Sequence, residues 1–371
     1  MPCFFRILRF FRADSATHAA AQPLGWTLLF AALFPREGGV FQNKMKTPHF
    51  PRELLFRGER VQTIWRQTMN IYEETTQRIL KQLDEGVIPW RKTWASGLPA
   101  SLSTGREYRG INILILSTAG YSSRYWVTFR EALRLGGNVR KGEKATPIIY
   151  WHWRTPEELA KLQERSGKAD LAPCVPFTSA VFNLDQVDGV PRPEATQEFN
   201  HVRRLELADY LLDVMPDKPE IVHSLSDEPS YRSREDRVTL PHLSQFENAD
   251  EYYATLFHEL THASGHERRL NRIVEQEGDA IERYSFEELV AEFGAAFLCG
   301  FAGINNAGTE ALAASYIHGW AEKLRNDHRL VMRAASAAQR AADYIRGKVV
   351  TDAKPSTEEE QRPAAETHLA A

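Results

Sequence analysis

Cysteine is scarce in this chain of 371 residues, which contains only Cys3, Cys174 and Cys299. The three are scattered along the sequence, and none belongs to a CxxC pair of the kind that holds zinc in a knuckle. The sequence therefore excludes a disulfide framework. It is compatible with a reducing compartment, so we predict a cytoplasmic protein.

A long hydrophobic run is also missing. The most apolar stretch, PLGWTLLFAALFP, is too short to span a bilayer, and no convincing small-residue cleavage site follows it. We therefore expect no stable association with a membrane. The stretch belongs to a segment with little regular period, and we interpret residues 1–68 as a poorly ordered or spurious N-terminal extension.

Neither sign of charge dominates the chain, whose formal net charge is −3. With 43% hydrophobic and 26% charged residues, its composition fits a soluble protein of two domains plus tails. The chain contains no internal repeat. Composition therefore limits the class of protein, and only sequence motifs can indicate its chemistry.

An HExxH motif lies in NADEYYATLFHELTHASGH, a segment with the apolar spacing of an amphipathic helix. Positions i and i+4 share one face of a helix, so His258 and His262 can bind one metal ion. Glu259 lies close enough to polarise a metal-bound water, and we predict it as the catalytic general base. The alternative is a surface helix that carries these side chains without a metal.

Two schemes can supply a third ligand. The metzincin pattern requires a histidine where this chain has Arg268, so that scheme fails, and we expect His266, just past Gly265, to point away from the metal. The second scheme uses the helix predicted from YSFEELVAEFGAAFLCGF, in which Glu288 and Glu292 share a face. We predict Glu288 as the ligand. Glu292 is expected to accept a hydrogen bond from an imidazole N–H, or to replace Glu288.

Other interpretations of this second helix stay open. Ser285 and Glu288 also form an S-x-x-E capping box, which requires no metal. Glu287 is expected to point to another side of the helix. Tyr284 or Tyr231 could stabilise an oxyanion, and either could instead be a packing residue.

The predicted ligands determine the cofactor and the chemistry. Two imidazoles, one carboxylate and an open position suit Zn²⁺, and they also suit Mn²⁺ or Co²⁺. Such a centre activates water for amide hydrolysis, so the sequence predicts a zinc metallopeptidase. Upstream, SYRSREDRVTLP is expected to form a strand that edges the cleft and pairs with an extended peptide.

Basic and aromatic residues are interleaved in the part of the chain from Met69 to Arg154. This part has 13 Lys or Arg against 7 Asp or Glu, and it holds five of the eight tryptophans. Cations follow phosphates and rings stack on unpaired bases, so the pattern is typical of a protein that binds single-stranded nucleic acid. The predicted contacts are Trp90, Arg91, Trp94, Arg109, Lys141 and Lys144.

Two further expectations concern this basic segment. In VRKGEK, Gly142 would let a turn present backbone N–H groups beside two lysines, as in a phosphate-binding nest. Four other aromatic residues are expected in the core instead: Trp126, Phe129, Trp151 and Trp153. After them, RTPEELAKLQERSGKADLAPCVPF is polar and contains Pro and Gly, so it is expected to be an exposed loop or insertion.

Taken together, several segments closely resemble the ArdC antirestriction family of plasmids and mobile elements: PWRKTW, TGREYRGIN, TFREALRLGGNVRKGEKA, VFNLDQ, LFHELTHASGHERRLNR and EELVAEFGAAFL. The resemblance covers most of the chain from Met69 to about Lys348. One departure lies in its N-terminal part, where the family has Asn after a Pro and this chain has Ala100 and Ser101 after Pro99. A DNA contact by that amide is therefore not expected here.

The resemblance implies an α+β fold with an N-terminal domain that binds single-stranded DNA and a mainly helical, zincin-like metallopeptidase domain. We place these domains at residues 69–195 and 196–350, followed by a disordered tail at 351–371. The family's metal motif falls on the HExxH residues named above, with an acidic partner between Glu288 and Glu292. The implied role is protection of incoming plasmid DNA from host restriction during conjugation.

Three functions are compatible with these observations. The protein could protect DNA by binding single strands, with the metal in an auxiliary role. It could be an active metalloprotease that the DNA-binding half directs to a protein of the restriction or conjugation machinery. It could also be a non-catalytic module that accompanies plasmid priming, although an intact Glu259 argues against this third function. We prefer the first as biological role and allow the second as mechanism.

Overall fold

A computed structural model describes the chain in these ranges: 72–91, 97–167, 171, 174–193, 201–225, 228–272, 280–306 and 319–348. They all belong to one compact unit. The extension predicted at 1–68, the tail predicted at 351–371 and the predicted contact Trp94 lie outside the described residues.

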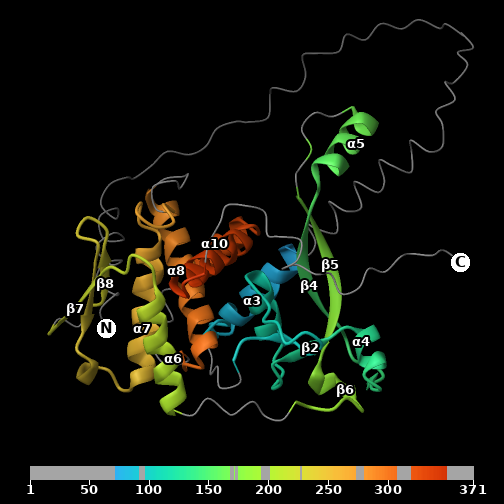
Figure 1. The fold of residues 1–371 in the computed structure, drawn as a ribbon, viewed down its shortest axis with the longest axis horizontal. Coiled ribbons are helices and arrows are strands. Elements are labelled where there is room, and N and C mark those ends of the chain that lie inside the picture. The colour runs from blue at the N-terminus through green and yellow to red at the C-terminus, as the bar shows by residue number, and fades with distance from the viewer. Residues whose placement is uncertain are drawn as a thin grey trace, which may run out of the picture. The chain divides into compact units, whose positions relative to one another are not determined.

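The N-terminal half combines short helices with a four-stranded sheet of order β1-β2-β5-β4 and a two-stranded sheet of β3 and β6. After a helix at 72–84, its elements are β1 (Ala100–Ser101), α3 (Ile111–Ser117), β2 (Tyr125–Val127), α4 (Phe129–Arg134), β3 (Asn138–Val139), β4 (Thr146–Trp153), α5 (Pro156–Ser166), β5 (Cys174–Asn183), the 3₁₀ turn η1 (Leu184–Gln186) and β6 (Val187–Asp188). The longest pairing is the antiparallel hairpin of β4 and β5, with α5 at its far end (Figure 1).

Helix α5 lies in the segment that is predicted to be an exposed loop or an insertion. Its N-terminus is closed by a capping box, in which the Thr155 side chain accepts from the Glu158 N–H and the Glu158 carboxylate accepts from the Thr155 N–H. Pro156 adds a favourable first helical residue. None of the side chains of α5 is buried, so local capping signals make this helix without a core contact.

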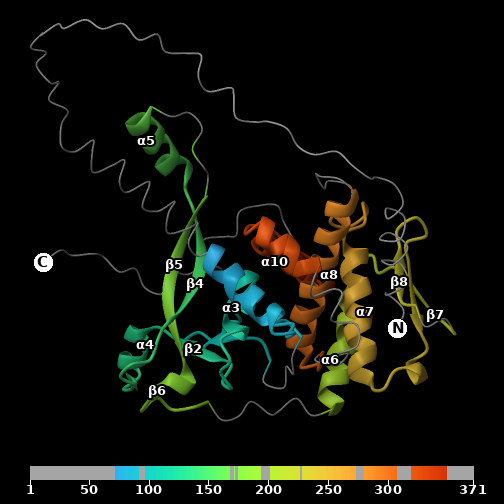
Figure 2. The same ribbon diagram turned by 180° about the vertical axis from the view of Figure 1, so that it is seen from behind.

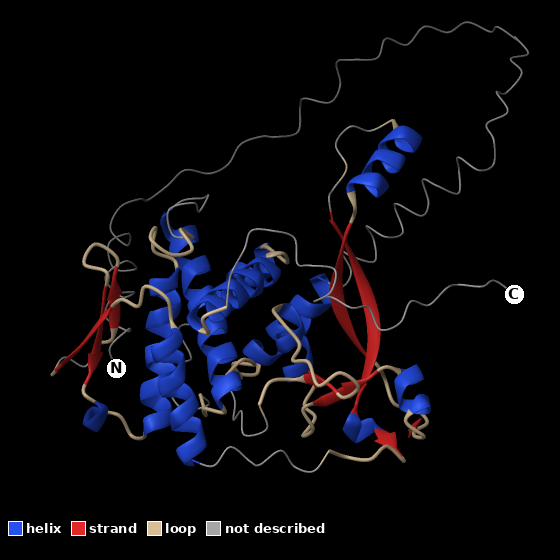
Figure 3. Ribbon diagram, in the orientation of Figure 1, coloured by secondary structure: helices blue, strands red, loops and turns tan. Residues whose placement is uncertain are grey.

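The C-terminal half is mainly helical and contains one three-stranded sheet of order β7-β9-β8. Its elements are α6 (His201–Val214), β7 (Glu220–Ser224), β8 (Ser230–Arg232), β9 (Arg237–Pro241), the 3₁₀ turn η2 (Leu243–Gln245), α7 (Ala249–Ser264), α8 (Ala280–Ala302), a helix at 319–326 and α10 (Leu330–Ile345). The segment expected to be a single strand forms two, because β8 turns back antiparallel onto β9. Figure 3 shows the strands in two groups with helices between them.

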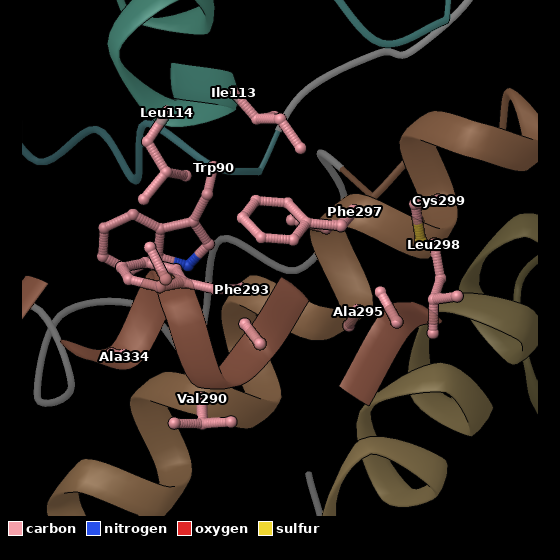
Figure 4. Close-up of a cluster of buried hydrophobic side chains, with 14 of the residues drawn as sticks. Trp90, Ile113, Leu114, Val290, Phe293, Ala295, Phe297, Leu298, Cys299 and Ala334 are labelled. Carbon is pink, nitrogen blue, oxygen red and sulfur yellow. The ribbon is translucent and has the colours of Figure 1, made fainter. Parts of the chain in front are cut away.

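One hydrophobic core joins the two halves. The cluster built on α7, α8 and α10 also contains Trp90 and residues of α3. Trp90 has no exposed surface, and its ring lies 4.9 Å from that of Phe293 and 5.3 Å from that of Trp320. Figure 4 shows the indole of Trp90 between α3 and the side chains of α8. Figures 1 and 2 show α3 and the helix at 72–84 between the β4–β5 hairpin and helices α8 and α10.

The observed architecture is α+β, as the sequence predicted, with an N-terminal mixed domain followed by a mainly helical one. Among the described residues, none of the helices is both long enough and apolar enough to cross a bilayer.

Candidate metal centre

Helix α7 presents the two histidines of the HExxH motif from one face. The helix begins after Asn248, whose side-chain oxygen accepts a hydrogen bond from the Glu251 N–H, and it ends at Gly265. Its apolar residues Leu256, Phe257 and Leu260 have no exposed surface. Burial of that stripe fixes the rotation of the helix, so the histidines one turn apart point toward α8.

A close contact between α7 and α8 brings the second set of polar residues to the histidines. A Cβ atom at Gly294 of α8 would lie 2.5 Å from Cγ2 and 2.6 Å from Oγ1 of Thr261, which precedes His262. Only glycine fits at that distance. Glu288 lies less than two turns earlier on α8, so this contact places its carboxylate over the histidine face.

The predicted ligand atoms converge. The Nε2 atoms of His258 and His262 are 3.1 Å apart, and the Glu288 carboxylate oxygens lie 3.6 Å from each of them. These three side chains form a group whose ligand atoms all lie within 4.8 Å of one another. A tetrahedral ion with bonds of about 2.0–2.1 Å needs ligand atoms roughly 3.3 Å apart. The donor set and its spacing therefore fit a divalent metal, and His266 is not part of the group.

The structure removes the capping alternative for Glu288. Helix α8 already runs from Ala280, so Ser285 and Glu288 lie in its interior rather than at its N-terminus. The Ser285 hydroxyl is instead in contact with the ammonium group of Lys323. Glu288 is therefore available to face the histidines. Burial raises its pKa, but its hydrogen bond with His258 and the charges of both histidines outweigh this effect and lower the pKa.

The other ring nitrogen of His258 faces Glu292. Its Nδ1 lies 3.7 Å from Glu292 Oε1, which places this carboxylate beside the imidazole for which it was predicted as an acceptor. Arg91 donates to both carboxylate oxygens at 2.7 and 3.1 Å, and the indole N–H of Trp90 donates to Oε2 at 3.0 Å. Burial raises the pKa of Glu292, but the charge of Arg91 outweighs this effect and lowers the pKa to about 2.

The other ring nitrogen of His262 faces Glu287, so the expectation that Glu287 points elsewhere is wrong. His262 Nδ1 lies 3.4 Å from Glu287 Oε1, and Arg272 donates to both oxygens of this carboxylate at 2.6 and 3.0 Å. Arg272 also donates to the Thr261 carbonyl at 2.8 Å. Burial raises the pKa of Glu287, and Arg272 outweighs it and lowers the pKa to about 2. Glu287 and Arg272 were not predicted to take part.

The histidine face is rich in negative charge. Burial lowers the pKa of His262, but its hydrogen bond with Glu287 and the charge of Glu288 outweigh this effect and raise the pKa to about 9. The protein alone therefore holds a proton on this imidazole near neutral pH, at the place where a cation would bind. A divalent cation can replace that proton, because it interacts with the same carboxylates.

Of the remaining predicted catalytic groups, Glu259 and Tyr284 lie beside this cluster, whereas Tyr231 has a different partner. The side chain of Glu259 lies on α7 next to the ligands and the residue is only 3% exposed. Tyr284 is 45% exposed and its hydroxyl donates to Glu288, so it borders the site from the solvent side. Tyr231 instead donates its hydroxyl to Asp236 at 2.9 Å, which assigns it to the packing of the sheet.

The predicted DNA contacts are not brought together. Trp90 is fully buried, which contradicts its predicted role as a ring that stacks on bases. Arg91 is engaged with Glu292, and Arg109 forms an ion pair with Asp343 of α10. Both arginines therefore have structural partners that their sequence positions did not reveal.

Lys141 and Lys144 are exposed in the turn after β3, where Gly142 has a φ of 91°. The turn conformation agrees with the requirement for glycine at this position. Helix α4 packs against β3 and presents further exposed side chains. Phe129 is 53% exposed, so the prediction that it lies in the core is wrong, whereas Trp126 is 2% exposed as expected. We give the name α4 surface to one exposed ring and four exposed cations of this region: Phe129, Arg130, Arg134, Lys141 and Lys144.

Two family models match this chain. The model of the N-terminal domain of anti-restriction factor ArdC matches residues 69–182, and the model of a zincin-like metallopeptidase matches residues 214–337. The first covers the half with the α4 surface, and the second covers all the residues of the metal cluster.

Three curated proteins are similar to this chain over 74% of its length. Two Escherichia coli proteins named DNA primase TraC are 34% and 35% identical over 293 and 295 residues, which is 74% of this chain. The chain spans only 27% and 20% of their lengths. The uncharacterized protein y4eC of Sinorhizobium fredii is 34% identical, and the chain covers 91% of it.

Solved structures are also similar over this region. Crystal structures of the antirestriction ArdC protein from plasmid R388, one Mn(II)-bound and one metal-free, match with TM-scores of 0.58 and 0.59 and identities of 34% and 33%. Each match covers 74% of this chain and 96% of the plasmid protein. The order of the two domains, their fold and this degree of identity agree, and the chain belongs to the ArdC antirestriction family.

Proposed function

We propose that this protein binds single-stranded DNA through its N-terminal half and thereby protects incoming plasmid or mobile-element DNA from host restriction. We assign this activity to a domain at residues 69–195, followed by a metallopeptidase domain at 196–350. The observation that carries the proposal is the match to the R388 antirestriction protein, of which the chain covers 96% at 34% identity.

The α4 surface is the best candidate for the DNA contact. It combines an exposed ring, Phe129, with basic side chains on α4 and in the turn that holds Lys141 and Lys144. A ring that stacks on a base contributes about 1–3 kcal/mol, and cations beside it neutralise phosphates. We do not assign this role to the earlier candidates Trp90 and Arg91, because both donate to Glu292 inside the protein.

The second half supports a metal-dependent hydrolase as the accompanying mechanism. His258, His262 and Glu288 would hold a divalent ion, and Zn²⁺, Mn²⁺ and Co²⁺ all suit these ligands. When bound, such an ion supplies Lewis acidity that lowers the pKa of water and polarises a carbonyl group. The R388 relative has been crystallised with Mn(II), which supports a metal in this family without fixing the ion here.

The residues of this chain supply the proton transfers and the orientation. Glu287 and Glu292 face the Nδ1 atoms of His262 and His258, so the Nε2 atoms are left as ligands. A carboxylate oxygen of Glu259 would accept a proton from the attacking water and return it to the leaving amide nitrogen. An intact, buried Glu259 beside two oriented imidazoles is the observation that favours an active peptidase over a purely structural metal centre.

Protection is tested by transfer of an unmodified plasmid into a restricting host that expresses the protein. We expect the wild type to raise the number of transformed cells. The double variant K141A/K144A should lose protection and oligonucleotide affinity, whereas K161A/R165A, which removes two exposed cations from α5, should keep both. Equal loss in both double variants would contradict the assignment to the α4 surface.

The peptidase mechanism is tested with Glu259→Gln in the same assay. If protection is lost while DNA affinity and metal content stay unchanged, hydrolysis is the mechanism of protection. If protection is kept, binding of the strand is sufficient. The TraC relatives suggest a third role, in which the chain accompanies priming without catalysis. Stimulation of primer synthesis by both wild type and Glu259→Gln, without any protection, would favour that role.

A further inference from the structure

We infer that the N-terminal half completes the metal centre, with Trp90 and Arg91 acting as positioning residues for His258 through Glu292. This inference rests on the proposed metal site and goes beyond it, because it makes metal affinity a property of both halves of the chain. Trp90 and Arg91 are about 200 residues away from Glu292 in sequence, and both donate directly to its carboxylate.

The contacts fix the carboxylate of Glu292 in one orientation. Arg91 bonds both oxygens, its Nη2 to Oε1 at 2.7 Å and its Nε to Oε2 at 3.1 Å. A bidentate pair of this kind holds the plane of a carboxylate as well as its position. The Trp90 N–H takes up a further lone pair of Oε2, so Oε1 is the oxygen that faces His258 Nδ1 at 3.7 Å.

Trp90 is itself held in place by residues of the C-terminal half. The ring of Trp90 packs edge-on against Phe293 of α8 and against Trp320. The Asn306 side-chain amide donates to the Trp90 carbonyl at 3.3 Å. The side chain of Arg91 is only 21% exposed, which limits competition by water for the carboxylate. Trp90 and Arg91 therefore form a fixed insertion beside the ligands rather than a surface contact.

The chain contains an internal comparison for this arrangement. His262 faces Glu287, and Glu287 is held by Arg272 in the same bidentate manner. Arg272 belongs to the C-terminal half, whereas Arg91 belongs to the N-terminal half. One imidazole is thus oriented from within its own domain, and the other is oriented from the domain to which we assign DNA binding.

Metal affinity of the full-length protein tests the inference directly. Groups that orient a metal-binding imidazole typically change affinity by about 10–100-fold when they are removed. We expect Arg91→Met to weaken binding of Mn²⁺ and Zn²⁺, measured by competition with a chelating indicator, by about 10–100-fold. Arg272→Met should weaken it by a similar factor. Arg91→Lys keeps the charge but loses the bidentate geometry, so we expect an intermediate value.

The matched control is Arg325→Met. Arg325 pairs with Asp84 of the helix at 72–84, so this variant also removes an ion pair between the two halves, but one whose side chains are about half exposed and do not belong to the group of metal ligands. We expect its metal affinity to equal that of the wild type. The absorption spectrum of the Co²⁺-loaded protein gives a second readout, because it reports the geometry of the ligands: it should change in Arg91→Met and stay unchanged in Arg325→Met.

The outcomes separate the inference from the proposed function. If the wild type binds no divalent metal, the proposed metal site itself fails. If the wild type binds and Arg91→Met equals Arg325→Met in affinity and spectrum, the positioning role of the N-terminal half is overturned. Should Arg91→Met not fold, Trp90→Phe and Arg91→Lys decide, since Trp90→Phe keeps a ring in the core and removes only the N–H donor. Wild-type affinity and spectrum in both would equally overturn the inference.

Discussion

A single methyl group at Gly294 should measurably destabilise this protein, because α7 and α8 touch there. The added Cβ would lie 2.5 and 2.6 Å from side-chain atoms of Thr261, which is fully buried and whose hydroxyl donates to the Phe257 carbonyl at 2.7 Å. Thr261 is therefore not free to turn away. Overpacking of this kind costs about 1–3 kcal/mol, and two contacts this short favour the upper end of that range. The higher helix propensity of alanine offsets up to about 1 kcal/mol of this loss in stability.

The expected net loss for Gly294→Ala is thus about 2 kcal/mol, which corresponds to roughly 3–4 °C in Tm for a unit of this size. Scanning calorimetry of the full chain measures it. Gly319→Ala is the control, because a Cβ at Gly319 meets nothing within 4 Å and alanine should be neutral or stabilising there. Adding Thr261→Ala to Gly294→Ala should recover much of the loss, since it removes both clashing atoms. If Gly294→Ala is as stable as Gly319→Ala, the close approach of the two helices is wrong, and with it the geometry that brings Glu288 to the histidines.

Three further predictions concern the metal and the DNA. Because the pKa of His262 is raised to about 9, a metal ion must displace the proton of this imidazole when it binds. The apparent association constant of the metal should therefore rise about tenfold per pH unit between pH 6 and 8 and level off above pH 9. A flat profile in calorimetric titrations would contradict the raised pKa. Metal at 100 times its Kd should add about 2.7 kcal/mol to the free energy of unfolding of the wild type. EDTA should abolish this increment, and His258→Ala should not show it. In K141A/K144A, the slope of log affinity for a single-stranded oligonucleotide against log salt should become shallower by about 1.4. Each lost phosphate contact reduces the slope by about 0.7. An unchanged slope would show that neither lysine contacts the strand.

The parts of the site that follow from local sequence were predictable. The apolar stripe of α7, its Asn248 cap and the Gly265 end define a helix, and helical spacing then places His258 and His262 on one side. The same rule put Glu288 and Glu292 on one face of α8. Sequence alone could not exclude a capping box at Ser285, because that depends on where α8 begins, and in the structure it begins earlier, at Ala280.

The parts that depend on contacts between distant segments were not predictable. Tryptophan beside arginine in PWRKTW is an equally good signal for a base-stacking surface and for a buried aromatic that carries a hydrogen-bond donor. Trp90 is of the second kind, because α8 offers a carboxylate to its indole N–H and Phe293 to its ring. The exposed Phe129 was misplaced for the opposite reason: its aromatic character suggested the core, although α4 has only one buried residue.

A buried carboxylate is costly unless a cation compensates it, and for Glu292 that cation comes from the other half of the chain. Glu292 is 9% exposed, and among the described residues the cation that compensates it is Arg91. The C-terminal half without Arg91 would hold an uncompensated charge beside His258, and the carboxylate that faces the Nδ1 of His258 would no longer be held in place. Any movement of the segment that carries Trp90 and Arg91, such as one that accompanies binding of a strand, must then alter metal affinity. By reciprocity, if binding of the strand moves this segment, bound metal changes the affinity for the strand by the same factor. Oligonucleotide titrations with and without saturating Mn²⁺ measure that factor, and equal affinities would show that the contact is rigid in both states.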